Sequence, residues 1–244
     1  MSQQELTTND KAARAWAIYT THFVVVTFEK LKEIYEGEAD FEDSSDEDCE
    51  KVLQYFLDLI APYDPEFAKI VEENKSLRER PEYHPEESAF IHIGKVFIRA
   101  CYFAGYEFLH CNLTSRPVET TDNKVLALVV TALMHDMFKM RTLKYHPVHG
   151  YPQCPGHDKK AAEYFRNTQR NILQFSDELS DTIEWLIANH MRIAQIDEMR
   201  PHKQAELRDH PDFKYLEIFH QMDNMLKPFE LRTAYNKLNQ IVAN

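Results

Sequence analysis

The chain has 244 residues and a formal net charge of −12, which disfavours nucleic acids and anionic membranes as partners. Its hydrophobic fraction of 43%, with 5 Gly and 11 Pro, excludes collagen-like and disordered classes. The first residues contain no cationic apolar leader, and the longest mostly apolar run, residues 125–134, is about half as long as a bilayer span. We therefore expect a soluble, cytoplasmic protein with one large domain or a domain plus an appendage.

Helical periodicity dominates the chain, and convincing alternating strands are absent. We therefore predict an all-α fold. The expected helices cover residues 12–35, 45–61, a segment starting at 64–66, 86–109, 123–140, 157–175, 176–190, 212–226 and 229–242. Thr8 and Asn9 are the expected caps of the first helix. The expected irregular stretches are residues 111–122, 141–155 and 193–211.

The acidic excess is concentrated in residues 33–50, where ten Asp and Glu occur without a basic residue. Blocks of like charge repel one another and stay hydrated. We interpret this run as a solvated loop with no catalytic role. It lies in an expected N-terminal helical appendage, residues 1–84, which precedes a helical bundle over residues 85–244.

Cysteine usage argues against two classes of site. Cys49, Cys101, Cys111 and Cys154 lie far apart without a Cys-x-x-Cys pair, which disfavours a zinc ribbon or a dithiol redox site. Twelve histidines are the unusual feature, because histidine is the commonest ligand of transition metals.

Four polar side chains fall on helix faces that should be buried. His92, His135, His190 and Asp223 share helical spacing with apolar residues. One such histidine alone is better explained as a core residue bonded to a carbonyl. Four of them on four helices favour a shared metal ion, which would satisfy them all. Asp136 follows His135 directly, and neighbours on a helix project about 100° apart, so the pair can supply two ligands to one cluster.

The order of these residues along the chain resembles that of the HD-domain metal-dependent phosphohydrolase superfamily. It is most similar to the HD domain that follows the catalytic head of bacterial CCA-adding enzymes. The similarity covers about residues 85–230. The motifs that carry it are Phe90-Ile91-His92, Ala132-Leu133-Met134-His135-Asp136-Met137-Phe138-Lys139, Pro155-Gly156-His157-Asp158, Ala188-Asn189-His190 and Met222-Asp223-Asn224.

The resemblance implies an HD-type helical bundle that binds one or two divalent ions, with Mn, Fe, Co, Zn and Mg as candidates. The implied ligands of the first ion are His92, His135, Asp136 and Asp223, and those of the second are His157 and His190, with Asp136 as a bridge. Asp136 and Lys139 are the implied catalytic residues. Two positions depart from the family pattern, since Phe138 replaces the usual Gly and Asp158 the usual Glu.

Metal-activated water in such a site can hydrolyse a phosphate ester. Because the protein is acidic, local cations must attract the substrate, and Lys139, Arg141, Lys144 and His149 are the expected phosphate contacts. The chain length and acidic appendage are similar to those of deoxynucleoside 5′-monophosphatases of large tailed phages. That similarity implies a nucleoside 5′-monophosphate substrate, deoxy forms preferred, and a host-cytoplasm location, without nucleic-acid or membrane partners. The expected pocket combines His92 and the loop of residues 139–156 with an insertion after Gly105.

Two alternative functions use the same ligands, and two others are disfavoured. Mixed-valent di-iron oxygenases of the family share the ligand order, and phosphodiesterases or triphosphohydrolases share the hydrolytic chemistry. An inert HD module is disfavoured because it has no reason to keep a complete ligand set. Transfer-RNA processing is opposed by the acidic charge and by the absence of a nucleotidyltransferase head. The sequence leaves the oligomeric state open.

Overall fold

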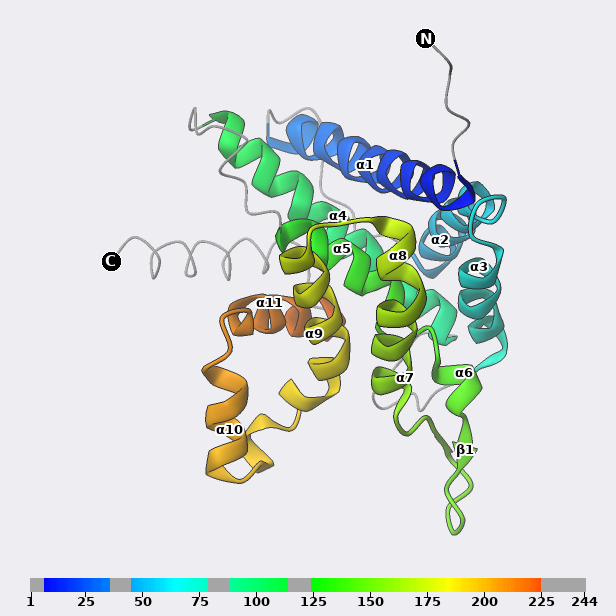
Figure 1. Ribbon diagram of the computed structural model, residues 1–244, viewed down its shortest axis with the longest axis vertical. Coiled ribbons are helices and arrows are strands. Elements are labelled where there is room, and N and C mark those ends of the chain that lie inside the picture. The colour runs from blue at the N-terminus through cyan, green and yellow to red at the C-terminus, as the bar shows by residue number, and fades with distance from the viewer. Residues whose placement is uncertain (1–6, 36–44, 79–87, 114–123, 225–244) are drawn as a thin grey trace.

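The computed structural model of the protein describes residues 7–35, 45–78, 88–113 and 124–224 (Figure 1). The expected all-α class is confirmed, since the described chain consists of helices and one short hairpin. The expected helix at 229–242 lies outside the described residues, as do residues 114–122 of one expected irregular stretch. The domain boundary at residue 84 also lies outside them, so the division into appendage and bundle stays a prediction.

The N-terminal part contains α1 (Thr8–Tyr35), α2 (Asp46–Ile60), α3 (Pro65–Glu72) and the 3₁₀ turn η1 (Glu73–Ser76). The cap of α1 is Thr7 and not Thr8 or Asn9, because Thr7 Oγ1 accepts the N–H of Asp10 at 3.2 Å and the Asp10 carboxylate accepts the N–H of Thr7 at 3.0 Å. Ser45 forms the same kind of box at α2. Part of the expected acidic loop is therefore helix, where acidic side chains in the first turn favour the positive end of the helix dipole.

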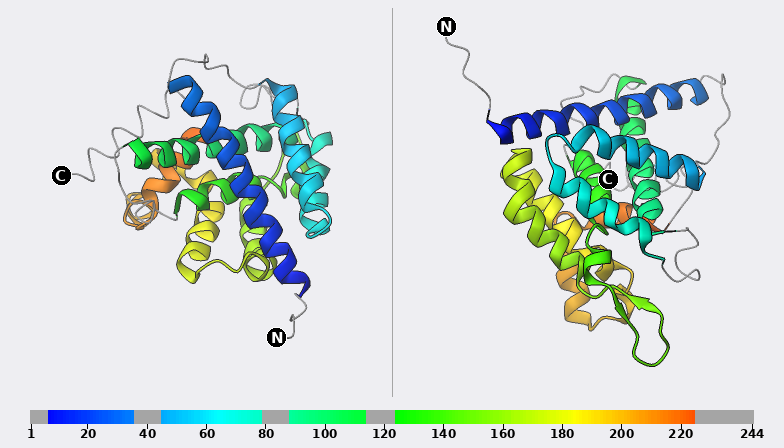
Figure 2. Two further views of the ribbon diagram at one scale, coloured as in Figure 1. Left: turned by 90° about the horizontal axis from the view of Figure 1, so that it is seen from above. Right: turned by 90° about the vertical axis from the view of Figure 1, so that its right-hand side faces the viewer.

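The rest of the described chain, residues 88–113 and 124–224, forms the bundle around the expected ligands. Its elements are α4 (Ala89–Leu113), α5 (Lys124–Met134), α6 (Lys139–Thr142), β1 (Lys144–Tyr145), β2 (Pro152–Gln153), α7 (His157–Tyr164), the π-helical turn η3 (Phe165–Gln169), α8 (Arg170–Leu173), α9 (Asp177–Ile193), the 3₁₀ turn η4 (Ile196–Glu198), α10 (Pro201–Arg208) and α11 (Phe213–Asp223). Helix α1 crosses α4 and covers one side of this bundle (Figure 2).

Two stretches expected to be irregular contain secondary structure. Within residues 141–155, β1 and β2 pair as an antiparallel hairpin that projects from the bundle (Figures 1 and 2), with Gly150 in the left-handed region at φ +69°. Within residues 193–211, α10 begins with Pro201 at its first turn. Leu207 is the buried residue of α10, so this helix lacks the apolar periodicity by which it could have been predicted.

Two expected helices are interrupted. The helix expected over residues 123–140 ends at Met134, and residues 135–138 form a turn in which the N–H of Lys139 bonds to the carbonyl of Asp136 at 3.0 Å. The helix expected over residues 157–175 contains η3, a π-helical segment of the kind that often occurs at functional sites.

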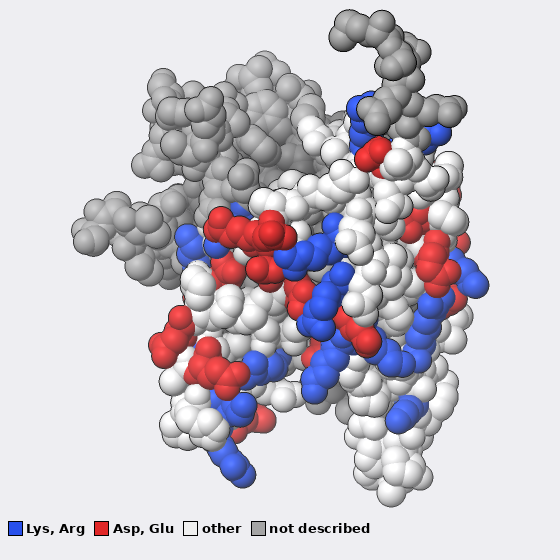
Figure 3. All heavy atoms as spheres, in the orientation of Figure 1, with Lys and Arg blue, Asp and Glu red and all other residues white. Residues whose placement is uncertain are grey.

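One continuous hydrophobic core joins the N-terminal helices to the bundle. Trp16 of α1 packs edge-on against Phe56 of α2, with ring centroids 5.5 Å apart, and Phe56 lies 5.3 Å from Phe97 of α4. Acidic and basic side chains are interspersed on the face seen in Figure 3, and the end of the hairpin there carries no Lys, Arg, Asp or Glu. Among the described helices, none has the length and apolar character of a membrane span.

Candidate metal centre

Helix ends bring the six expected metal ligands together in the interior of the bundle. His92 lies in the first turn of α4, whose start is capped by the Ser88 hydroxyl bonded to the N–H of Ile91 at 3.3 Å. His157 is the first residue of α7, directly after Gly156 in the left-handed region at φ +75°. The other ligands are His135 and Asp136 after α5, His190 in the last turn of α9, and Asp223 at the end of α11.

The first group of ligand atoms surrounds Oδ2 of Asp136. This oxygen lies 3.2 Å from Nε2 of His135 and 3.6 Å from Nε2 of His92. Oδ1 of Asp223 lies 2.9 Å from Nε2 of His92 and 3.4 Å from Nε2 of His135. His92, His135 and Asp136 have the spacing to hold one metal ion, and Asp223 contributes a second carboxylate beside them.

The second group surrounds the other oxygen of the same carboxylate. Oδ1 of Asp136 lies 3.0 Å from Nε2 of His157 and 3.5 Å from Nε2 of His190. The two imidazole nitrogens are 3.3 Å apart. These three side chains also have the spacing to hold a metal ion. Asp136 is therefore shared between two adjoining groups, as a bridging carboxylate would be.

Backbone carbonyls fix the orientation of three of these imidazole rings. Nδ1 of His135 lies 3.0 Å from the carbonyl oxygen of Ala132, and Nδ1 of His190 lies 2.8 Å from that of Ile187. Nδ1 of His157 makes the same contact 2.6 Å from the carbonyl of Cys154. A carbonyl only accepts hydrogen bonds, so Nδ1 carries the proton and Nε2 presents a lone pair to the cluster. This is the usual support of a metal-binding histidine.

The cluster holds more acceptors than donors, which fits a cation. In the orientation set by the carbonyls, the Nε2 lone pairs of His157 and His190 face each other and the oxygen of Asp136. Nε2 of His135 and Oδ1 of Asp136 are buried and make no hydrogen bond. Leaving buried polar atoms unpaired is costly. A divalent ion in each group would satisfy these atoms at once, and mixed nitrogen and oxygen ligands suit transition metals.

Burial and neighbouring charges shift the pKa values of the clustered side chains. Burial opposes protonation of His135, but the charges of Asp136 and Asp223 outweigh it and raise the pKa of His135 to about 10. Burial would raise the pKa of the Asp136 carboxyl, yet the charges of His135 and Lys139 hold this pKa well below its ordinary value. Burial lowers the pKa of His190. Burial would also raise the pKa of the Asp223 carboxyl, but the contacts with His135 and His92 hold it well below its ordinary value. Both carboxylates of the cluster therefore stay ionised and ready to bind a cation.

Lys139 belongs to the cluster as the sequence predicts. Its Nζ lies 2.8 Å from Oδ2 of Asp136, and the side chain is buried. Asp223 is the most open of the six ligand candidates, with 18% of its side chain exposed against 3% for Asp136. Asp223, at the end of α11, is therefore the ligand candidate in greatest contact with solvent.

The other three expected phosphate contacts lie elsewhere. Arg141 binds Glu73 through Nε at 2.6 Å and Nη2 at 2.9 Å, and its Nη1 lies 3.1 Å from Glu66. These contacts raise the pKa of Arg141 above its ordinary value and tie it to the N-terminal part. Lys144 and His149 are exposed on the projecting hairpin, where His149 stacks with His146. The structure groups none of the three with the buried ligands, and their role in substrate binding stays a prediction.

Replacing His157 or His190 by alanine is expected to halve the metal content, because these residues complete the second group and leave the first intact. Circular dichroism should report an unchanged helical fold. His210, which stacks on Trp185 with ring centroids 3.8 Å apart, supplies the control, since His210→Ala removes a histidine outside the cluster. Metal analysis of the four proteins tests this prediction. Wild-type content in both His157→Ala and His190→Ala would contradict the second site.

The sequence gives no sign of a residue that supports the cluster from the N-terminal part. Asn74 of η1 is fully buried and hydrogen-bonds the backbone on both sides of Lys139, at Met137 in the turn after α5 and at Met140 in α6. A single asparagine in a polar stretch has no motif by which this role could have been found. Comparisons of the chain with protein-family models, with curated proteins and with solved structures find no match.

Proposed function

We propose that the protein is a divalent-metal-dependent phosphohydrolase whose centre is built around Asp136. The observation that carries the proposal is the position of this carboxylate, which turns one oxygen to His92 and His135 and the other to His157 and His190. Two adjoining ions that share ligands are a recurrent arrangement in phosphoryl-transfer sites. Bound there, divalent ions would polarise a phosphoryl oxygen and lower the pKa of a water molecule.

The chain's own residues would hold and orient the substrate. The buried ammonium of Lys139 stands beside Asp136 and would place positive charge next to a phosphoryl oxygen. The backbone carbonyls behind His135, His157 and His190 keep the imidazoles in one orientation, so the ligand atoms need little rearrangement on binding. The buried position of the cluster limits access of bulk water and strengthens these electrostatic contacts.

The proposed substrate class is a small phosphate monoester, with nucleoside 5′-monophosphates first and deoxy forms preferred. The burial of the cluster favours a compact reacting group such as a phosphoryl group. The choice of nucleotide comes from the resemblance to HD-domain phosphohydrolases, and the deoxy preference comes only from the similarity to phage deoxynucleoside 5′-monophosphatases.

A phosphate-release panel tests the proposed reaction. Protein loaded with Mn²⁺ is incubated with nucleoside mono-, di- and triphosphates and with cyclic dinucleotides, and free phosphate and nucleoside are measured. We expect release of phosphate from the monophosphates and loss of all activity after chelation. Intact monophosphates combined with cleavage of triphosphates or cyclic dinucleotides would replace this substrate class by another of the same chemistry.

The histidine content of the cluster favours a second candidate, an oxygen-activating di-iron centre. Four imidazoles and two carboxylates form a ligand set that iron accepts as well as manganese or zinc. Retention of iron through purification, together with oxygen consumption on a polyol or phosphonate and no phosphate release, would favour this candidate over the phosphohydrolase.

A further inference from the structure

The side chain of Asn74 joins the N-terminal part of the protein to residues 137–140, the segment that follows Asp136 and contains Lys139. Asn74 is 0% exposed and lies in η1, directly after α3. Its Nδ2 donates to the carbonyl oxygen of Met137 at 2.8 Å, and its Oδ1 accepts the N–H of Met140 at 3.1 Å. Met137 and Met140 lie before and after Lys139 in the chain, so one side-chain amide holds the backbone on both sides of this lysine.

The same amide also fixes the end of α3. Nδ2 of Asn74 lies 3.1 Å from the carbonyl oxygen of Ile70 and 3.2 Å from that of Val71. Carbonyls in the last turn of a helix lack partners within the helix, so a side-chain donor satisfies them. The end of α3 and the turn at Met137 are thus held by one side chain that uses both its donor and its acceptor.

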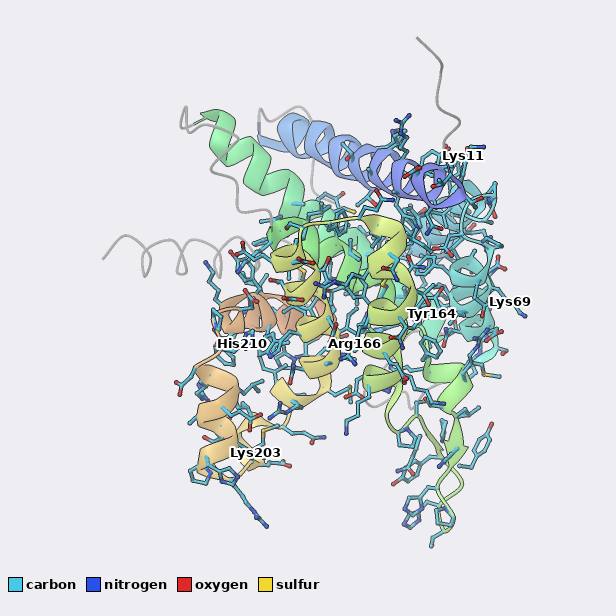
Figure 4. All side chains as sticks on the ribbon, in the orientation of Figure 1. Lys11, Lys69, Tyr164, Arg166, Lys203 and His210 are labelled. Carbon is cyan, nitrogen blue, oxygen red and sulfur yellow. The ribbon has the colours of Figure 1, made fainter. Side chains whose placement is uncertain are left out.

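A second contact between the same two segments lies at the surface. The Arg141 guanidinium, just beyond the turn, binds both oxygens of Glu73, the residue before Asn74. Figure 4 shows α3, with Lys69 labelled, beside α7, which carries Tyr164. Gln169 of η3 donates to the Tyr164 hydroxyl at 3.2 Å and to the Asp64 cap of α3. Arg141 and Gln169 therefore join the N-terminal part to the bundle at two further points.

We propose that Asn74 is a positioning residue of the metal centre. It holds the backbone from Met137 to Met140 so that the Asp136 carboxylate stays between the two histidine groups and the Lys139 ammonium stays on Oδ2. Precise placement of ligands depends on such support, because displacements of a fraction of an ångström weaken a site. This inference rests on the metal site of the proposed function and does not depend on its substrate.

Metal affinity distinguishes positioning from general stabilisation. Asn74→Ala is compared with Leu53→Ala, which removes an equally buried side chain of α2 from the core. Mn²⁺ binding is titrated by calorimetry at a temperature at which circular dichroism shows both variants folded. We expect the Kd to rise at least about tenfold in Asn74→Ala and to stay within about twofold of the unaltered protein in Leu53→Ala. Asn74→Asp turns an oxygen toward the carbonyl oxygens of Ile70, Val71 and Met137 in a buried position, so its Kd should rise at least as far as that of Asn74→Ala.

Equal Kd values in Asn74→Ala and the unaltered protein would overturn the proposal. The proposed function would survive that result, whereas absence of Mn²⁺ binding by the unaltered protein would remove both. If Asn74→Ala does not fold, hydrogen exchange of the unaltered protein is measured with and without Zn²⁺. Coupling is reciprocal, so if the bond between Asn74 and the Met140 N–H supports metal binding, bound metal should in turn stabilise that bond. Zn²⁺ should slow exchange of the Met140 N–H more than that of Leu57 in α2. Equal slowing at both amides would overturn the proposal.

Discussion

Asp136→Asn is expected to lower phosphate release by about 10³-fold or more, because the cluster loses the one ligand that both groups share. Metal ions contribute several kcal/mol to stabilising such a transition state, and each 1.4 kcal/mol or so corresponds to a factor of ten in rate. The amide is almost the same size as the carboxylate, but it lacks the negative charge that two adjoining cations require. Steady-state rates at saturating Mn²⁺ measure the effect.

The matched control for this variant is Asp212→Asn. Asp212 is also buried and also pairs with a lysine, since its Oδ1 lies 2.7 Å from Nζ of Lys124, while Oδ2 accepts the Thr182 hydroxyl at 3.0 Å. Loss of that carboxylate should affect stability without touching the metal ligands. Equal rates of Asp136→Asn and the unaltered protein would end the hydrolase hypothesis, and an equal loss of rate in Asp212→Asn would assign the effect to destabilisation.

Lys139→Met should lower turnover by roughly two to three orders of magnitude, because a single charged group aimed at a developing negative charge is typically worth a few kcal/mol. The residue contacts Asp136, so the variant also tests whether the lysine acts on substrate or only holds the carboxylate. If it acts on the phosphoryl group, metal content stays at the wild-type level while turnover falls.

Two further variants separate these roles of Lys139. Lys139→Arg keeps the charge and should recover part of the turnover, although its planar group differs in geometry. Lys124→Met removes a lysine that pairs with a buried aspartate outside the cluster and should leave turnover per folded molecule unchanged. Loss of metal from Lys139→Met in proportion to its loss of activity would show that the lysine only positions Asp136.

The sequence predicted the ligand cluster better than the backbone that carries it. His92, His190 and Asp223 lie on the apolar faces of helices, and their spacing with buried neighbours placed them inside. The sequence argument for His135 and Asp136 assumed two neighbours on one helix. The structure instead ends α5 at Met134 and places both residues in a turn. Asn74 of η1 bonds the backbone of this turn at Met137, a contact that the local pattern of apolar residues does not reveal.

The remaining differences have long-range causes. Arg141 looked like a phosphate contact because it lies close to Lys139 in sequence, yet Glu66 and Glu73 hold it on the N-terminal part. Pairing between segments that are more than sixty residues apart cannot be read from local pattern. The role of Asn74 was hidden for the same reason, since its partners Met137 and Met140 lie in a different part of the chain.

The most direct test of the metal centre is the number of ions that the unaltered protein retains. The purified protein is loaded with Mn²⁺, freed of loosely bound ions by gel filtration, and analysed for metal per chain beside Asp136→Asn prepared in the same way. The two adjoining groups around Asp136 predict two ions in the unaltered protein and a clear loss in the variant. The same low content in both proteins would show that the buried histidines and carboxylates are not a metal site.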